Sequence, residues 1–372
     1  MVAAAVFYKP AVAVEPAPIQ VVKAEPAADW NARFDGGEGW IGGDGVYSVL
    51  LAPRRVLFLF GDTLLGKVSE GRRKGAAMVN NTVGLLSLAG PQARLRFVSG
   101  PAIGGKPSAV FVPADGRGWF WPQAAIEVHD RLFVFLAHID KTGKDGPFGF
   151  KQIGQCLATI DNPLDDPTAW RTEQRHLPFA EFHGERERWW GAALLAEGDD
   201  VYIYGIHDPC KQLGSKELIV ARAPSDKIAD FDAWRFQHGQ RWVATPTGEG
   251  LADRFASEFS VSRLPDGTGY LVVYTESGLS DRILGRVSAS PAGPWSEAVL
   301  LYTCPEMAGD KGVFCYAAKV HPWAARGNEL LISYCVNAWE FGRLFDDNHV
   351  YRPRFVRVTL AAGPQADRPS HD

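Results

Sequence analysis

Trp40 to Gly66, which read WIGGDGVYSVLLAPRRVLFLFGDTLLG, predict two β-strands joined by a tight turn. Residues 46–50 form the first strand. Residues 53–55 form the turn, because proline fixes φ and cannot donate to a ladder. Residues 56–60 are a run of β-branched, leucine and phenylalanine side chains, which is typical of a strand buried on both faces.

An aspartate stands at each end of this hairpin. Asp44 lies between two glycines just before the first strand, and Asp62 follows Gly61 directly after the second. A carboxylate at the end of a buried strand is where a β scaffold can present a reactive group. The alternative is that both aspartates are turn residues whose side chains bind the local backbone. Spacing alone leaves both interpretations open.

The bulk composition describes a large globular chain that is rich in aromatic residues. The 372 residues are 46% hydrophobic and carry a net charge of −4, so a large core is expected and a nucleic-acid partner is not. No apolar run is long enough to span a membrane. The 12 tryptophans and 21 phenylalanines can build the core or form flat platforms on which sugar rings stack. The oligomeric state is not predicted.

The five cysteines show no CxxC pair, which argues against a zinc cage. Buried free thiols are the expectation, and a Cys304–Cys315 disulfide is the alternative. No DxDxDG-type loop is present, so no cofactor is expected to be required, although a propeller channel leaves room for a structural calcium ion.

Three segments are predicted along the chain. Residues 1–28 are rich in Ala, Val and Pro and predict an N-terminal extension or linker, the remnant of a signal peptide in a secreted or periplasmic protein. Against export, Lys9-Pro10 interrupts the apolar run and no basic region precedes it. Residues 29–362 predict a single catalytic domain, and residues 363–372 a C-terminal tail.

The domain repeats one pattern: a strand, a tight polar turn, a long apolar strand, a loop and a further strand. The pattern recurs roughly every 60 to 70 residues, in about five units and without an amphipathic helix. Short strands with regular turn signals predict an all-β fold, and radial repetition buries this much strand without exposed edges. We therefore expect a five-bladed β-propeller, with a pair of two-sheet sandwiches as the alternative.

In a propeller, the first strand of each blade lines the central channel. One acidic or aromatic residue lies at the head of each expected first strand, and convergence of these residues would give an acidic pocket with aromatic walls, typical of a sugar site. The five residues are Asp44, Trp121, Trp190, Glu258 and Tyr316.

Cleavage of a glycosidic bond needs two carboxyl groups, one protonated and one ionised. The catalytic candidates are Asp44, Asp62 and Glu258, with Glu276 in reserve. Burial among tryptophans would raise the pKa of one carboxyl group, and a neighbouring cation or amide would keep another ionised.

Further residues are candidates for substrate binding, and each has a structural alternative. The Asn81 amide binds hydroxyl groups or makes a turn; Trp121 and Trp190 form platforms or pack in the core. His321 binds substrate or a metal, or is a hydrogen-bonded structural histidine. Arg354, with Arg352, pairs with a first-blade carboxylate or supports the last strand.

Several motifs resemble a known enzyme family. Three stretches resemble the opening of glycoside hydrolase family 183, the endo-D-arabinanases, and of related five-bladed-propeller furanosidases. They are GGDGVYSVLL, LFLFGDTLLG and MVNNTVGL. Three further stretches are similar to the end of those domains: CYAAKVHPW, LLISYCVN and YRPRFVRV. The resemblance therefore spans roughly residues 35 to 360.

The resemblance implies a glycosidase that degrades furanosides such as arabinan, with Asp44 and Asp62 as its essential carboxylates, one as acid and the other as nucleophile or base. More distant arabinanase and fructosidase propellers would add Glu258. The choices between D- and L-arabinan or fructan, endo and exo cleavage, and retention and inversion stay open. A non-catalytic carbohydrate-binding propeller is the alternative from another class.

Overall fold

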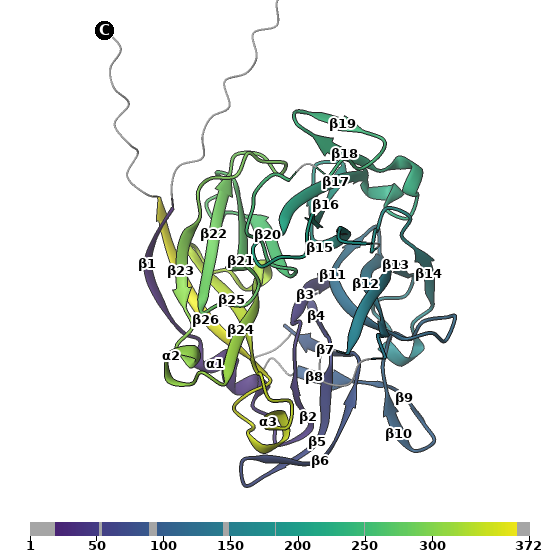
Figure 1. The fold of residues 1–372 in the computed structure, drawn as a ribbon, viewed down its shortest axis with the longest axis vertical. Helices are drawn as coiled ribbons and strands as arrows, with labels where there is room; N and C mark the ends of the chain where they lie inside the picture. The colour runs from purple at the N-terminus through teal and green to yellow at the C-terminus, as the bar shows by residue number, and fades with distance from the viewer. Residues whose placement is uncertain are drawn as a thin grey trace, which may run out of the picture.

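The structure is a computed structural model, and it describes residues 19–51, 54–88, 95–143, 149–182, 184–248 and 250–362. These residues are almost entirely β, which confirms the predicted class. Five antiparallel sheets of four or five strands follow one another along the chain (Figure 1). Each has a simple up-and-down order, except where a small sheet interrupts the first and the N-terminal strand joins the last.

The strand bounds, sheet by sheet, are as follows. The first sheet contains β3 (Tyr47–Leu51), β4 (Arg55–Phe60), β7 (Thr82–Ser87) and β8 (Leu95–Val98). The second contains β11 (Trp119–Val128), β12 (Arg131–Lys141), β13 (Phe150–Ile160) and β14 (Thr172–His176). The third contains β15 (Glu187–Glu197), β16 (Asp200–Asp208), β17 (Glu217–Pro224), β18 (Arg235–His238) and β19 (Arg241–Val243). The fourth contains β20 (Phe259–Arg263), β21 (Tyr270–Thr275), β22 (Arg282–Ser288) and β23 (Val299–Thr303). The fifth contains β24 (Val313–Val320), β25 (Glu329–Ala338), β26 (Arg352–Ala362) and β1 (Ile19–Pro26).

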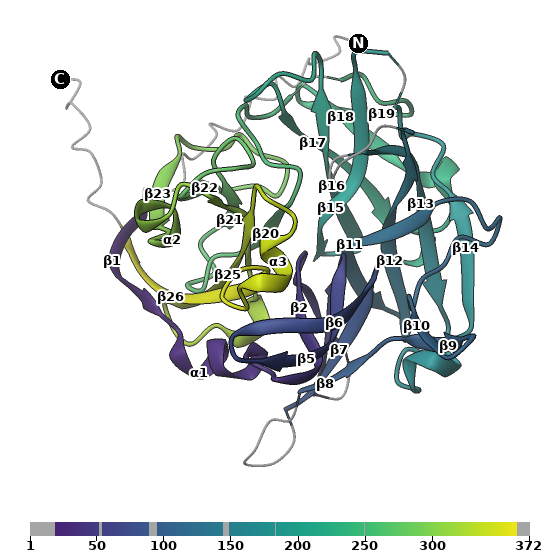
Figure 2. The same cartoon turned by 60° about the horizontal axis from the view of Figure 1, so that its bottom comes forward.

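Smaller elements decorate this frame. A three-stranded sheet interrupts the first large sheet and projects from its end, and a short hairpin follows it (Figure 2). The small sheet contains β2 (Glu38–Gly43), β5 (Thr63–Ser69) and β6 (Arg72–Val79), and the hairpin contains β9 (Gly100–Ile103) and β10 (Lys106–Ser108). The described α-helices are four residues long: α1 (Ala28–Asn31), α2 (Glu306–Gly309) and α3 (Arg343–Asp346). None of the helices described has the length and apolar character needed to cross a membrane.

The first strands of the five sheets meet in the middle of the molecule. β11 contacts β3 and β15, and β20 contacts β15 and β24. Ser48 on β3 and His321, directly after β24, complete the ring through a 2.7 Å hydrogen bond between Oγ and Nδ1. This radial order of antiparallel sheets is typical of β-propellers and differs from the sandwich alternative.

The predicted hairpin shows how sequence produces this packing. All five side chains from Val56 to Phe60 are buried, as expected for a strand covered on both faces. Leu57 and Leu59 pack into the core between the first and second sheets, while Val56, Phe58 and Phe60 pack into the core between the first and fifth. The alternation of strand side chains thus fills two different cores from one strand.

Two predictions about the chain's organisation need correction. Residues 19–26 are not an extension or linker: they form β1, which pairs with β26, because Ile19, Val21 and Ala24 pack against the core of the last sheet. Residues 1–18 and the predicted tail, 363–372, lie outside the described residues. All five cysteines have free thiols, so the Cys304–Cys315 disulfide does not form, and only Cys210 is exposed.

Candidate active site

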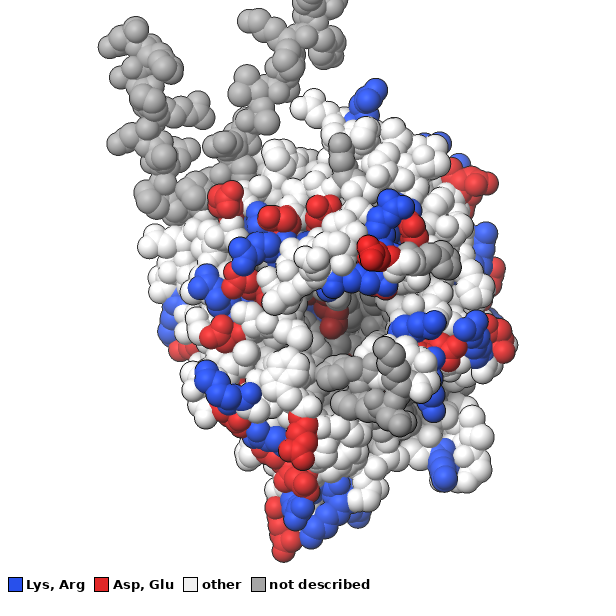
Figure 3. All heavy atoms as spheres, viewed as in Figure 1, with Lys and Arg blue, Asp and Glu red and all other residues white. Residues whose placement is uncertain are grey.

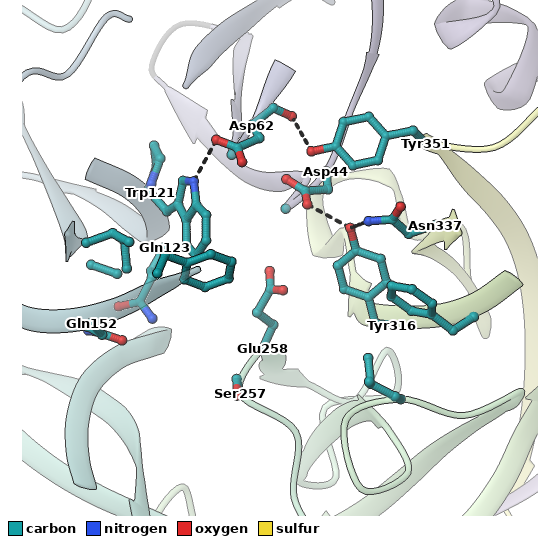
Figure 4. A pocket seen from close by; sticks show the side chains of 18 of the residues that line it. Asp44, Asp62, Trp121, Gln123, Gln152, Ser257, Glu258, Tyr316, Asn337 and Tyr351 are labelled. Carbon is teal, nitrogen blue, oxygen red and sulfur yellow. Dashed lines mark hydrogen bonds between the residues drawn. The ribbon is translucent and has the colours of Figure 1, made fainter. Parts of the chain in front are cut away.

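A cavity of about 570 Å³ opens where the first strands meet, and Figure 3 shows this hollow with acidic atoms in its depth. Its wall is unusually aromatic, and three carboxyl groups face into it (Figure 4). The carboxyl groups are those of Asp44, Asp62 and Glu258, and the rings are those of Tyr47, Trp121, Phe150, Trp189, Phe314, Tyr316, Trp339, Phe341 and Tyr351.

The backbone brings Asp44 and Asp62 together. β2 ends at Gly43 and β4 ends at Phe60, so each aspartate lies in the turn that follows a buried strand. The amide of Gly61 donates to the carbonyl of Asp44 at 3.0 Å, which joins the two turns. A Cβ at Gly61 would lie 2.6 Å from Asp44 Oδ1, so only glycine leaves room for the Asp44 carboxyl group here.

Asp44 is held in its neutral form at neutral pH. Burial, followed by the charge of Asp62, raises the pKa of Asp44 from 3.8 to about 8. The hydroxyl of Tyr316 donates to Asp44 Oδ2 at 2.7 Å and opposes this shift without cancelling it. Asp44 can therefore supply a proton at pH 7.

Asp62 is held ionised at the same pH. Burial raises its pKa to about 6, and hydrogen bonds from Trp121 and Asn80 limit the rise. Trp121 Nε1 donates to Asp62 Oδ1 at 2.8 Å, and Asn80 Nδ2 donates to the same oxygen at 3.1 Å. Two N–H donors stabilise an anion, whereas Asp44 accepts one hydroxyl, so the two carboxyl groups differ in protonation.

Glu258 faces the pair from the opposite side of the cavity (Figure 4) and has a cation as its partner. Lys319 Nζ, on a side chain that is only 3% exposed, lies 3.0 Å from Glu258 Oε1. The same ammonium donates to the carbonyl of Ala317 at 2.9 Å and lies 4.2 Å from the ring centroid of Tyr47. This network fixes the position of the Glu258 carboxyl group beside the cavity.

Trp121 and Tyr316 line the cavity, as predicted, and each donates a hydrogen bond to a candidate catalytic carboxyl group. Neither position was distinguishable in the sequence from a core aromatic residue.

Asn81 and Trp190 are not at the site. Asn81 is fully buried, its Nδ2 donates to the carbonyls of Phe111 and Phe120, and its Oδ1 accepts from the amide of Phe111. Trp190 is 1% exposed and does not line the cavity. Their preceding neighbours, Asn80 and Trp189, take the predicted places, because adjacent residues of an extended chain point in opposite directions.

His321 and Arg354 also lie away from the cavity. His321 is completely buried behind β3, where it bonds Ser48, and burial lowers its pKa to about 3. Arg354 lines a separate groove, donates to the carbonyl of His349 at 2.6 Å and lies 3.5 Å from Glu306. Both therefore have the structural role that was the alternative.

The sequence also carries a signal for Lys319, the partner of Glu258. Lys319 is a lone charge inside the apolar strand CYAAKVHPW, and an apolar strand buries a lysine only when a partner compensates the charge.

The cavity wall on the side of the third sheet carries four charged residues: Glu187, Asp208, Lys211 and Lys216. Lys211 Nζ lies 2.7 Å from Glu187 Oε1. Their mixed charges give this wall a polar character.

A family model described as "Domain of unknown function (DUF5005)" matches residues 27–360. The chain belongs to this family. One relative of this DUF5005 chain is Notoamide biosynthesis cluster protein J' of Aspergillus versicolor, which is 28% identical over an alignment of 258 residues. The alignment covers 61% of this chain and 68% of the relative.

Two solved structures share the fold of the DUF5005 chain. A Bacteroides ovatus protein, provisionally described as a hydrolase, superposes with a TM-score of 0.72 at 20% identity over 90% of each chain. The β-xylosidase RS223 superposes with a TM-score of 0.51 at 11% identity over 89% of this chain and 95% of the other. At these identities the likeness shows the fold alone. Kinship with glycoside hydrolase family 183 stays a prediction.

Proposed function

We propose that this protein is a five-bladed β-propeller glycoside hydrolase that cleaves furanosidic linkages in arabinan-type polysaccharide. One observation carries the proposal: two buried carboxyl groups at the floor of an aromatic cavity have pKa values moved to about 8 and about 6. A purely carbohydrate-binding site needs the aromatic rings, but it has no use for two buried acids in different protonation states.

In the proposed reaction, Asp44 is the acid and Asp62 the base or nucleophile. Asp44 donates its proton to the leaving glycosidic oxygen, and Asp62 attacks the anomeric carbon or activates a water molecule. Trp121 orients Asp62 through its indole N–H. Tyr316 orients Asp44, and Asn337 Nδ2 lies 3.4 Å from the Tyr316 hydroxyl behind it.

The substrate class rests on the motif resemblance and is supported by the cavity. Aromatic faces on both sides suit a flat sugar ring, and the third carboxylate, Glu258, can accept hydrogen bonds from its hydroxyl groups. A β-xylosidase with the same fold is itself a glycosidase by name. Because polysaccharides of this kind lie outside the cytoplasm, the proposal includes export to the periplasm or the medium.

The test is product release from D-arabinan, L-arabinan and levan by the wild type, Asp44→Asn and Asp62→Asn. Asp130→Asn is the matched control, since Asp130 is an exposed turn residue on the second sheet. We expect oligosaccharides from one polymer, a loss of about 10² to 10⁴-fold or more in both cavity variants, and none in the control.

The same panel separates the alternatives. Product anomers followed by NMR would distinguish retention from inversion. Binding of a polymer without release of any product, in protein that is folded by circular dichroism, would replace the enzyme with a carbohydrate-binding propeller. Full activity in Asp62→Asn would remove Asp62 from the reaction.

A further inference from the structure

Three potential metal ligands meet on the second sheet, away from the cavity. His138 lies on β12, Cys156 on β13 and His176 on β14, which are neighbouring strands. One ligand atom from each lies within 4.8 Å of the other two, and no other such group of three occurs among the residues that the structure describes.

Strand register, not sequence spacing, assembles this group. Cys156 pairs directly with His176 on one side and with Leu136 on the other. His138 is two residues beyond Leu136 on the same strand, and so it shares the face of the sheet that carries Cys156. The residue opposite His138 is Gly154, which has no side chain to fill the space beside the imidazole.

The distances suit a tetrahedral zinc ion. Cys156 Sγ and His176 Nδ1 are 3.4 Å apart. Bond lengths of about 2.3 Å to sulfur and 2.0 Å to nitrogen place two tetrahedral zinc ligands about 3.5 Å apart. The third ligand atom lies within 4.8 Å of the other two, so a side-chain shift on the order of 1 Å would complete the arrangement.

The hydrogen bond of His138 leaves one of its ring nitrogens free to bind a metal. Its Nε2 donates to the carbonyl of Arg117 at 2.7 Å, so the proton is on Nε2 and the lone pair is on Nδ1. Metal-ligating histidines commonly donate their other ring nitrogen to a backbone carbonyl, which fixes the tautomer and the ring orientation.

The surroundings allow a metal to enter. His138 and Cys156 are buried, whereas His176 is exposed to solvent. The loop that carries Asp115 is tied to β14, because Gln174 Oε1 accepts from the amide of Ala114 at 3.1 Å.

We propose that His138, Cys156 and His176 bind one zinc ion, with water as the fourth ligand. The ion would fasten the outer strand β14 to the centre of the sheet. Binding displaces the thiol proton of Cys156, so one proton is released per ion and affinity rises with pH. This site is independent of the proposed hydrolysis.

The experiment is a zinc titration of the full chain after chelator treatment, with metal content measured by mass spectrometry. Cobalt in place of zinc reports a thiolate ligand through its charge-transfer absorption. We expect one equivalent of zinc and a higher melting temperature in the wild type, and affinity at least 10-fold weaker in His176→Ala and Cys156→Ser. Cys210→Ser, which removes the exposed thiol, is the matched control and should bind as the wild type does.

Two results would overturn the proposal. One is a folded wild-type protein that retains no zinc. The other is zinc affinity in His176→Ala equal to that of the wild type. His176 is exposed, so this variant should fold even if Cys156→Ser does not.

Discussion

Asp44 and Asp62 show how the same type of side chain acquires two protonation states within one cavity. Both are buried, and burial alone would raise the pKa of each. Asp62 accepts two N–H donors, whereas Asp44 feels the negative charge of Asp62 and accepts one hydroxyl. The pair therefore carries one proton at neutral pH, and the proton is on Asp44.

The pH profile of the reaction should reflect these two groups. Activity requires Asp62 ionised and Asp44 protonated, so kcat/KM should fall below about pH 6 and above about pH 8. The measurement is kcat/KM on the cleaved polymer from pH 4 to 10. Asp130→Asn is the control, and its kcat/KM should fall at low and at high pH as that of the wild type does. A profile that is flat from pH 5 to 9 would contradict the assignment.

Asp44→Asn should make the protein more stable at neutral pH. Between pH 3.8 and about 8 the folded state keeps a proton on Asp44 that the unfolded state has released. The free energy of unfolding therefore decreases as pH rises through this window, and removing the carboxyl group recovers on the order of 1 to 3 kcal/mol at pH 7. Urea denaturation at pH 7 and pH 4 measures the difference, which should nearly vanish at pH 4.

The control for this effect is Asp130→Asn, whose unfolding free energy should match the wild type at both values of pH. A loss of stability in Asp44→Asn at pH 7 would show instead that the carboxyl group is a structural turn residue, the alternative left open by the sequence.

The sequence was sufficient to predict the two aspartates of the cavity, but some of the side chains predicted around them lie elsewhere. Asp44 and Asp62 could be predicted because each follows a glycine at the end of a strand. Asn81 and Trp190 were each one residue away from the lining residue, since the choice of face depends on register and bulges that no local pattern shows. For the same reason a search for CxxC spacing could not find His138, Cys156 and His176, which three strands bring together.

At the scale of elements, the Glu258–Lys319 pair joins two neighbouring sheets. Glu258 precedes β20, and Lys319 lies on β24, so their 3.0 Å contact ties the fourth and fifth sheets beside the cavity. The two partners are not equally buried: the side chain of Lys319 is 3% exposed and that of Glu258 is 26% exposed. Loss of one partner should therefore cost more than loss of the other.

Glu258→Gln should destabilise the fold more than Lys319→Met does. The first variant leaves a buried cation without its anion and should cost about 2 to 4 kcal/mol, while the second leaves a carboxylate that water can reach and should cost about 1 to 2 kcal/mol. Denaturant unfolding of both single variants and the double variant measures the coupling. The double variant should resemble Lys319→Met.

A surface pair provides the control for this cycle. Lys74 and Glu70 are 2.9 Å apart and well exposed, so Lys74→Met should change stability by less than about 1 kcal/mol. Equal costs for the two cavity variants would mean that water solvates both charges and that the pair does not join the sheets.

At the scale of the whole molecule, the chain closes its ring with its own N-terminal segment. β1 forms the outer strand of the fifth sheet, beside β26, the last strand of the chain (Figure 2). The repeat of strand and turn predicted an all-β fold whose sheets are built mainly from strands close in sequence, because that pattern is local. It did not predict β1, since IQVVKAEP pairs with a strand more than 300 residues away and its Ala and Pro content is typical of linkers.

Val21→Asp should weaken this closure, whereas Val22→Asp should not. Val21 packs against the core of the fifth sheet, and its neighbour Val22 lies at the β-bulge and is 65% exposed. A carboxylate at position 21 must be buried or must pull β1 away from β26, which should cost about 2 kcal/mol, while position 22 should change by less than about 0.5 kcal/mol. Thermal unfolding and limited proteolysis of both variants test this. The contrary result is that Val21→Asp has the same melting temperature as Val22→Asp and is not cleaved by protease within residues 19–26. The ring would then be held closed by the contacts of its first strands, and β1 would only cover the fifth sheet.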